Sequence, residues 1–98
     1  MNINIKKENG ITVVKIDGRL DTTTAPELEN AINNEGESLK NLVLDLEGVA
    51  YISSAGLRVL LSAQKKMNLQ GHMELINVSE DVMDIFEMTG FADILEIK

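Results

Sequence analysis

The first 17 residues contain two segments with apolar side chains on either side of a polar turn, and this pattern predicts a β-hairpin. Ile3 and Ile5 stand between polar neighbours, which is typical of a strand with one exposed face. The segment Glu8–Gly10 contains the Asn-Gly pair favoured in tight hairpin turns. Residues Ile11 to Asp17 are rich in β-branched side chains, so we expect them to form the antiparallel partner strand.

The first helical pattern follows a run of three threonines. Thr24 and Glu27 have the spacing of a capping box, and Pro26 suits the first turn of a helix. Leu28 and Ile32 lie on one helical face, and Gly36 is the expected stop. A helix is therefore predicted between Thr24 and Gly36.

The remaining pattern alternates strands with helices. In chain order we expect a central strand at Leu42–Leu46, a helix at Leu57–Leu69 closed by Gly71, a strand at Met73–Val78, a helix capped by Ser79 and ended by Gly90, and a last short strand at Ile94–Ile97. The order β-β-α-β-α-β-α-β predicts one α/β domain over residues 1–98. Its sheet should be mainly parallel with right-handed crossovers, an antiparallel N-terminal edge strand and helices packed against it.

Composition then removes several classes of function. The net charge is −7, which argues against nucleic acid as a partner and favours a partner with basic patches. Without cysteine the chain has no disulfide and no thiolate chemistry. No apolar run reaches the ~20 residues of a membrane helix, so we expect a cytoplasmic protein that needs no membrane partner.

Topology brings separate polar segments to one edge of the sheet. Parallel strands end on the same side, where ligands of open α/β sheets gather. The residues that leave strands there include Asp21, the run Thr22 to Thr24, and Ser53 with Ser54. The two serines stand where a strand passes into a helix, so they either cap that helix or present a hydroxyl for phosphorylation.

Catalysis and ligand binding are weaker interpretations of the same residues. A nucleophilic serine needs a base, and the single histidine, His72, is expected at the opposite edge. Carboxylates at Asp17, Asp21, Asp45 and Glu47 lack the spacing of a metal site. No glycine-rich phosphate loop is present, and the only arginines are Arg19 and Arg58, which argues against a nucleotide-binding module. We therefore predict a protein that is not an enzyme and has no metal or cofactor.

The segment Asp45–Leu57 resembles the signature of STAS domains, and more narrowly that of bacterial anti-sigma factor antagonists. Three further segments resemble other elements of the family, in the same order along the chain. They are Gly18–Asp21 with Ala25 and Pro26, Leu69–Leu75, and Val82–Gly90. The similarity spans essentially the whole chain and leaves no extra domain.

This resemblance implies a partner-switching cycle. In the family, the unmodified antagonist binds an anti-sigma factor that is also a serine/threonine kinase. Phosphorylation of the antagonist ends this binding, and a phosphatase restores the unmodified antagonist. Alignment with the family motif puts the phosphorylated residue at Ser54. Ser53 is the alternative, because it offers a second hydroxyl at the position where the family commonly has Asp. The implied partner-binding residues are Asp21, Thr22, Thr23, Thr24, Ser53, Ser54, Ala55, Gly56 and Arg58. A STAS subunit that acts as a scaffold without switching is the alternative function.

Overall fold

The computed structural model describes residues 1–98 and begins with the predicted hairpin. Strand β1 (Asn2–Glu8) pairs antiparallel with β2 (Ile11–Leu20). Asn9 and Gly10 connect them with φ of 53° and 80°, the left-handed backbone that a tight hairpin turn requires. Asn and Gly adopt this conformation more readily than other residues, so the local sequence specifies the turn.

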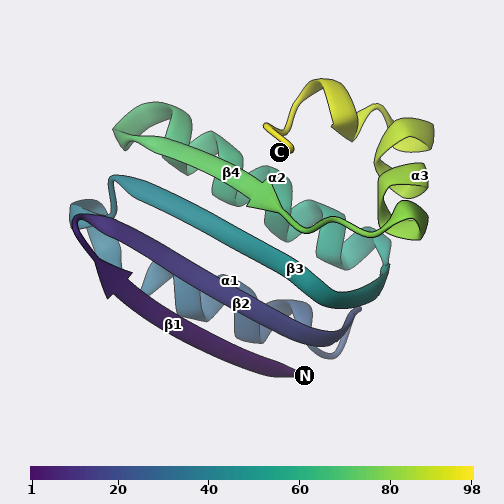
Figure 1. The fold of residues 1–98 in the computed structure, drawn as a ribbon, viewed down its shortest axis with the longest axis horizontal. Helices are drawn as coiled ribbons and strands as arrows, with labels where there is room; N and C mark the ends of the chain where they lie inside the picture. The colour runs from purple at the N-terminus through teal and green to yellow at the C-terminus, as the bar shows by residue number, and fades with distance from the viewer.

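The sheet is mixed and has four strands in the order β1-β2-β3-β4 (Figure 1). Strand β3 (Asn41–Ile52) runs parallel to β2, and β4 (His72–Ile76) runs parallel to β3. The antiparallel strand lies at one margin of the sheet, as the sequence predicts. We call the end of the sheet at the C-termini of β2, β3 and β4 the carboxyl edge, and the end at their N-termini the amino edge.

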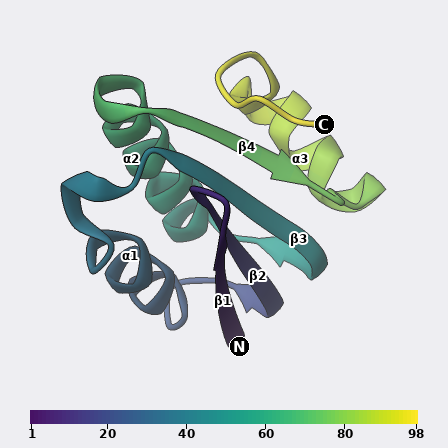
Figure 2. The ribbon, with the colours of Figure 1, turned by 60° about the vertical axis from the view of Figure 1, so that its left-hand side comes forward.

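Helices α1 (Ala25–Asn33) and α2 (Ser54–Gln70) lie side by side on one face of the sheet, whereas α3 (Glu80–Thr89) lies beyond β4 (Figure 2). Two short 3₁₀ turns, at Gly36–Ser38 and Phe91–Asp93, complete the fold. The face of the sheet opposite α1 and α2 carries the half-buried or exposed side chains of the strands. None of the helices is both long and apolar enough to cross a membrane.

The core fills the space between the sheet and the helices. The fully buried strand side chains alternate along β2, β3 and β4, namely Val14, Ile16, Leu42, Leu44, Leu46, Met73 and Leu75. Leu28 of α1, Leu60 of α2 and Phe86 of α3 meet them and are equally inaccessible to solvent. This period of two follows from the pleat of a strand, which sends successive side chains to opposite faces.

The predicted last strand at Ile94–Ile97 is wrong. The backbone N–H groups of Ile94 and Leu95 both donate to the Phe91 carbonyl, so the chain is still turning at these positions. Only Ile97 pairs with the sheet, in an isolated parallel bridge to Leu75. The C-terminal segment therefore covers the outer side of β4 without extending the sheet by a full strand.

Other boundaries also differ from the prediction. Strand β2 continues past Asp17 to Leu20, β3 continues past Leu46 to Ile52, and α2 begins at Ser54, before the predicted Leu57. Strand β4 ends at Ile76 and not at Val78, because Asn77 adopts a φ of 56° and donates its amide to Asp45. Helix α1 ends at Asn33, before the predicted stop at Gly36.

The capping box predicted at Thr24 and Glu27 is also wrong. Thr24 occupies the N-cap position of α1, but its side chain makes no capping hydrogen bond to the helix. Its hydroxyl instead donates to the Arg19 carbonyl at 2.6 Å and accepts from the Asp21 N–H at 2.9 Å. The preceding loop thus uses the hydroxyl that the sequence pattern assigned to the helix.

Candidate functional site

The carboxyl edge brings the ends of β2 and β3 together through the backbone. The N–H of Ser53 donates to the Leu20 carbonyl at 2.9 Å, and Leu20 is the Cα partner of Ile52 in the sheet. The loop Asp21–Thr24 and the start of α2 therefore lie next to each other, although more than a quarter of the chain separates them. Parallel pairing of β2 and β3 is the cause, because it makes both strands end on the same side.

Asp21 organises the loop before α1. Its carboxylate accepts hydrogen bonds from the N–H groups of Thr23 and Thr24, at 3.0 and 3.2 Å. The Thr24 N–H contributes most to holding the pKa of Asp21 below its ordinary value, and the Thr23 N–H, the Thr24 hydroxyl and the positive charge of Arg19 act in the same direction. The loop is therefore shaped by an ionised carboxylate at neutral pH.

Arg19 and Tyr51 flank this loop, and the sequence interpretation did not assign either to the site. The Arg19 guanidinium lies 4.4 Å from the centre of the Tyr51 ring, and its Nε lies 3.6 Å from Asp21 Oδ2. No sequence signal singles out this pair, because the register of β2 against β3 shifts between Gly18 and Leu20, on either side of Arg19. A cation stacked on an aromatic ring is thus presented at the edge.

The two candidate serines have different roles in the fold. Ser53 is the N-cap of α2, with extended backbone and a half-buried side chain whose hydroxyl accepts from the Gly56 N–H at 3.4 Å. Ser54 is the first residue of α2, is exposed, and makes no side-chain hydrogen bond within the protein. The cap and the free hydroxyl are therefore separate residues, so the two interpretations of this pair do not exclude each other.

Gly56 sets how closely α2 approaches the strand ends. A Cβ atom at this position would lie 2.9 Å from the Leu20 carbonyl oxygen and from a side-chain carbon of Ile52. Such contacts are closer than packed atoms tolerate, so only glycine allows the first turn of α2 to rest on β2 and β3. The orientation of Ser54 depends on this packing.

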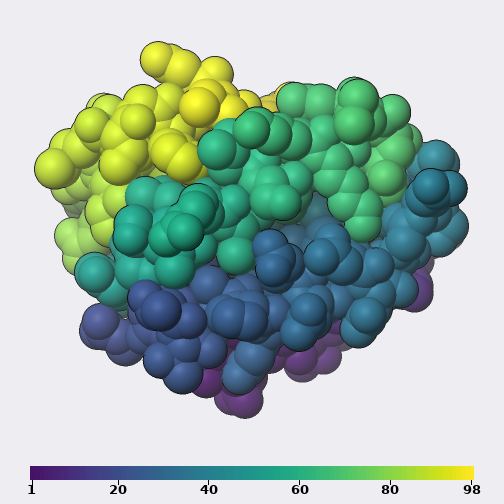
Figure 3. Space-filling model, turned by 180° about the vertical axis from the view of Figure 1, so that it is seen from behind, coloured from purple at the N-terminus to yellow at the C-terminus, as the bar shows by residue number.

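A shallow groove of about 550 Å³ runs from the carboxyl edge between α1 and α2. In Figure 3 it follows the boundary between the blue atoms of α1 and the teal atoms of α2. Thr22 and Pro26 line it from the α1 side, and Ala55, Arg58 and Lys65 line it from α2. The groove starts beside Ser54, and both of these cations stand on the α2 wall.

The residues weighed for catalysis and metal binding do not converge on Ser54. His72 begins β4 and pairs with Asn41, so it lies at the amino edge as predicted. Asp45 accepts from the Glu47 N–H at 3.1 Å and from the Asn77 side chain at 3.0 Å, which gives it a structural role in the sheet. Asp17, Asp21, Asp45 and Glu47 do not gather into a cluster of metal ligands.

Comparison with known proteins gives a consistent family. The family model for the STAS domain matches residues 2–98. The chain is 32% identical over 103 residues to the anti-sigma-B factor antagonist of Staphylococcus aureus, covering all of this chain and 94% of that protein. A crystal structure of an anti-sigma factor antagonist from Mycobacterium paratuberculosis superposes with a TM-score of 0.86 at 24% identity, covering 98% of this chain and 83% of that one.

The same fold occurs in SpoIIAA, an anti-sigma factor antagonist from Bacillus. Its unphosphorylated form has a TM-score of 0.77 at 15% identity, covering 99% of this chain and 87% of that chain. Its phosphorylated form has a TM-score of 0.76 at 15% identity, covering 99% and 91%. Sequence match, fold and topology agree, and the chain belongs to the STAS domain family.

Proposed function

We propose that this protein is an anti-sigma factor antagonist that acts as a phosphorylation switch in the cytoplasm. Unmodified, it binds an anti-sigma factor serine/threonine kinase through the carboxyl edge and thereby releases a sigma factor. Phosphorylation of Ser54 by that kinase abolishes binding, and a phosphatase restores it. The name of the S. aureus relative, an anti-sigma-B factor antagonist, supports the role, which requires no catalysis by this chain.

The observation that carries the proposal is the free hydroxyl of Ser54. This side chain is exposed at the first position of α2 and has no hydrogen-bond partner in the protein. Ser53 is half-buried and its oxygen already caps the helix at the Gly56 N–H. A kinase can therefore phosphorylate Ser54 without breaking a hydrogen bond of the fold, whereas phosphorylation of Ser53 would remove the helix cap.

The start of α2 also suits a phosphate electrostatically. A phosphoserine carries about −1.5 to −2 charges at neutral pH, and the unpaired N–H groups and dipole at a helix N-terminus stabilise negative charge. Arg58 lies one turn further along α2, on the same side of the helix as Ser54. We infer that the domain tolerates the modification and that the effect falls on the partner, which meets a bulky anion.

The surface around Ser54 supports a protein partner. Asp21 and Thr22 to Thr24 stand on one side of Ser54, and Ala55, Gly56 and Arg58 continue from it along α2, beside the groove. The chain as a whole carries a net charge of −7, so a kinase with basic patches around its contact surface would be attracted to it. Arg19 over Tyr51 adds a cation and an aromatic ring to the same edge.

Binding to the host's anti-sigma factor kinase tests the proposal. With ATP present, Ser54→Ala should stay bound because it cannot be modified, and Ser54→Asp should bind at least tenfold more weakly than the parent without ATP. Ser38→Asp is the matched control, since it adds the same charge on the exposed 3₁₀ turn before β3, away from the carboxyl edge. Equal affinity of Ser54→Asp and the parent contradicts the charge mechanism.

Mass spectrometry separates Ser54 from Ser53 and the switch from a scaffold. The kinase reaction should place one phosphate on Ser54 and none in Ser54→Ala, while Ser53→Ala should still be modified. Phosphate mapped to Ser53 would overturn the assignment. Protein isolated from its own host that is unmodified in every growth condition would favour a STAS scaffold that does not switch.

A further inference from the structure

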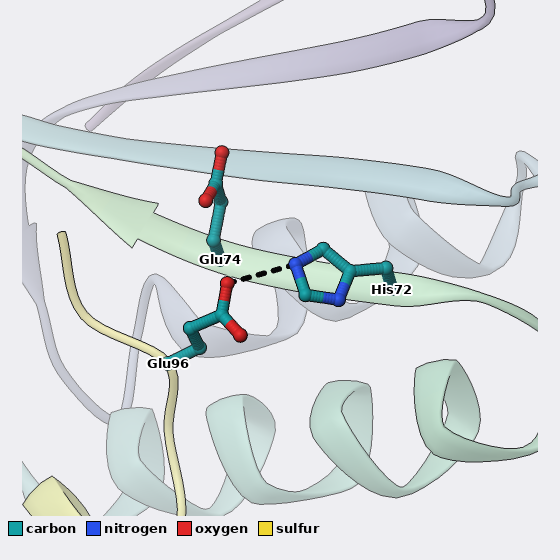
Figure 4. Close-up of side chains that lie close together, drawn as sticks. All are labelled: His72, Glu74 and Glu96. Atoms are coloured by element: carbon teal, nitrogen blue, oxygen red, sulfur yellow. Dashed lines mark hydrogen bonds and ion pairs between the residues drawn. The ribbon is translucent and has the colours of Figure 1, made fainter.

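Three side chains of types that can bind metal ions lie close together beside β4 at the amino edge, far from Ser54. His72 and Glu74 come from β4 and Glu96 comes from the C-terminal segment (Figure 4). One ligand atom from each of the three lies within 4.8 Å of the other two. His72 Nε2 and Glu96 Oε2 are 2.8 Å apart, in the contact drawn as a dashed line.

The backbone determines this juxtaposition. His72 and Glu74 are two residues apart on one strand, so their side chains leave the same face of the sheet. The Leu75 N–H donates to the Glu96 carbonyl, and the Lys98 N–H donates to the Leu75 carbonyl, each at 2.9 Å. Because Ile97 is the bridge partner of Leu75, Glu96 projects to the face that Glu74 and His72 share. Two separate segments thus supply one set of ligands.

We propose that His72, Glu74 and Glu96 form a binding site for a divalent ion of the zinc class. The ion would be held by His72 Nε2 and one carboxylate oxygen from each glutamate, with water completing a tetrahedral shell. Zinc bonds to nitrogen and oxygen measure about 2.0–2.2 Å, which places tetrahedral ligands roughly 3.4 Å apart. The side chains of His72 and Glu96 are 54% and 42% exposed, so small side-chain rotations bring the three atoms to this spacing.

The donor set selects the kind of ion. An imidazole with carboxylates suits zinc, nickel and copper, whereas calcium and magnesium prefer shells made of oxygen alone. The ion would replace the direct contact of His72 with Glu96 and neutralise two adjacent carboxylates. Lys98 Nζ, which lies 3.4 Å from Glu96 Oε2, currently supplies positive charge there and would be displaced.

A bound ion would join the start of β4 to the C-terminal segment. The backbone of that segment pairs with β4 through a single bridge, and a metal would replace the side-chain contact of Glu96 with His72 by a coordinated crosslink on the open face. The site uses none of the residues proposed to be phosphorylated or to bind the kinase. Its success or failure is therefore independent of the proposed function.

Calorimetric titration of the full chain with ZnCl₂ tests the site, with any polyhistidine tag removed. We expect saturable binding of one ion per chain and no binding of MgCl₂. His72→Gln and Glu96→Gln should each weaken binding roughly tenfold or more, since the loss of even an outer partner of a metal ligand costs 10–100-fold. Glu47→Gln, an exposed carboxylate near the other end of the sheet, should bind zinc like the parent.

A second measurement needs no variant. His72 is the single histidine, so one set of imidazole signals in an NMR titration reports on the site, and the Nε2 resonance should move on addition of zinc. Unchanged zinc affinity in His72→Gln, an imidazole that does not respond, or the absence of saturable binding would each overturn the proposal.

Discussion

The segments before α1 and α2, at the carboxyl edge, are stabilised differently from the amino edge of the sheet. At the carboxyl edge, the side chains of Asp21, Thr24 and Ser53 form hydrogen bonds to groups two to five residues away. At the amino edge, side chains join segments far apart in the chain. Gln70 donates to the carbonyls of Gly36 and Leu39, 34 and 31 residues away, and His72 meets Glu96 across 24 residues.

This difference separates recognition from the closing of the fold. Loops that satisfy their own polar groups can present a surface to a partner without help from the rest of the chain. Contacts between distant segments hold the domain together, because each one restricts a long stretch of chain. Changes at exposed residues of the carboxyl edge, such as Ser54, should therefore alter binding more than stability, and changes to the backbone packing of the amino edge, such as at Gly71, should do the reverse.

The largest effect is expected from glycine replacement at the amino edge. A Cβ on Gly71 would lie 2.0 Å from the Lys40 carbonyl oxygen, a backbone atom next to a central strand. Gly71→Ala should lower the free energy of unfolding by about 3 kcal/mol, the upper range for overpacking. Gly56→Ala, with contacts at 2.9 Å and a gain in helix propensity, should cost less.

Urea denaturation of both variants measures this ordering, with Ser62→Ala on the exposed side of α2 as the control. A larger loss from Gly56→Ala than from Gly71→Ala would reverse the comparison between the edges.

The next effect distinguishes the adjacent serines. Ser53→Ala removes the N-cap of α2 and should cost about 1 kcal/mol, whereas Ser54→Ala should stay within about 0.5 kcal/mol of the parent. Chemical denaturation monitored by circular dichroism gives both values. Equal losses in the two variants would mean that Ser54 is part of the fold, and its assignment as a free hydroxyl would fail.

A smaller effect is expected from the ion pair between His72 and Glu96. Both partners are about half exposed, and such pairs contribute less than about 1 kcal/mol. In buffer with a metal chelator, His72→Ala should speed hydrogen exchange at the Lys98 N–H, which bonds to Leu75, while the urea midpoint hardly moves. An unchanged exchange rate at Lys98 would show that this contact does not hold the C-terminal segment.

The smallest effect is confined to acid. The folded pKa of Asp21 lies below the ordinary value of 3.8, so its carboxylate stabilises the fold above that pH and the contribution disappears as pH falls through the folded pKa. An NMR titration should place the Asp21 midpoint below 3.8. Asp21→Asn should remove this part of the acid dependence, and a midpoint at or above 3.8 would contradict the hydrogen bonding of the loop.

Local sequence predicts the parts of the fold that depend on neighbouring residues. Asn9 and Gly10 form the predicted turn, Ser79 caps α3 through the Val82 N–H, and Gly90 ends that helix with a φ of 83°. Position along the strands also placed Asp21 and Ser54 on one edge, because parallel pairing is set by the order of elements.

What escaped prediction depends on distant pairing. The register of β2 against β3 shifts between Lys15 and Asp17 and again between Gly18 and Leu20, so the second half of β3 lacks a regular alternation that marks it as strand. The capping box is the exception, because Thr24 has cap spacing but its hydroxyl bonds to Arg19, only five residues away. The groove depends on how α1 and α2 pack against each other. Glu96 lies beside His72 only because the neighbouring Ile97 pairs with Leu75 of β4.

The unbonded hydroxyl of Ser54 has a consequence for protein turnover under the proposed cycle. Proteases act on the transiently unfolded population, which the free energy of unfolding sets. A modification that removes no internal hydrogen bond leaves that population nearly unchanged, so both forms should persist equally long. A cell could then alternate between them repeatedly without new synthesis, and the total pool would remain constant while its modified fraction carries the signal.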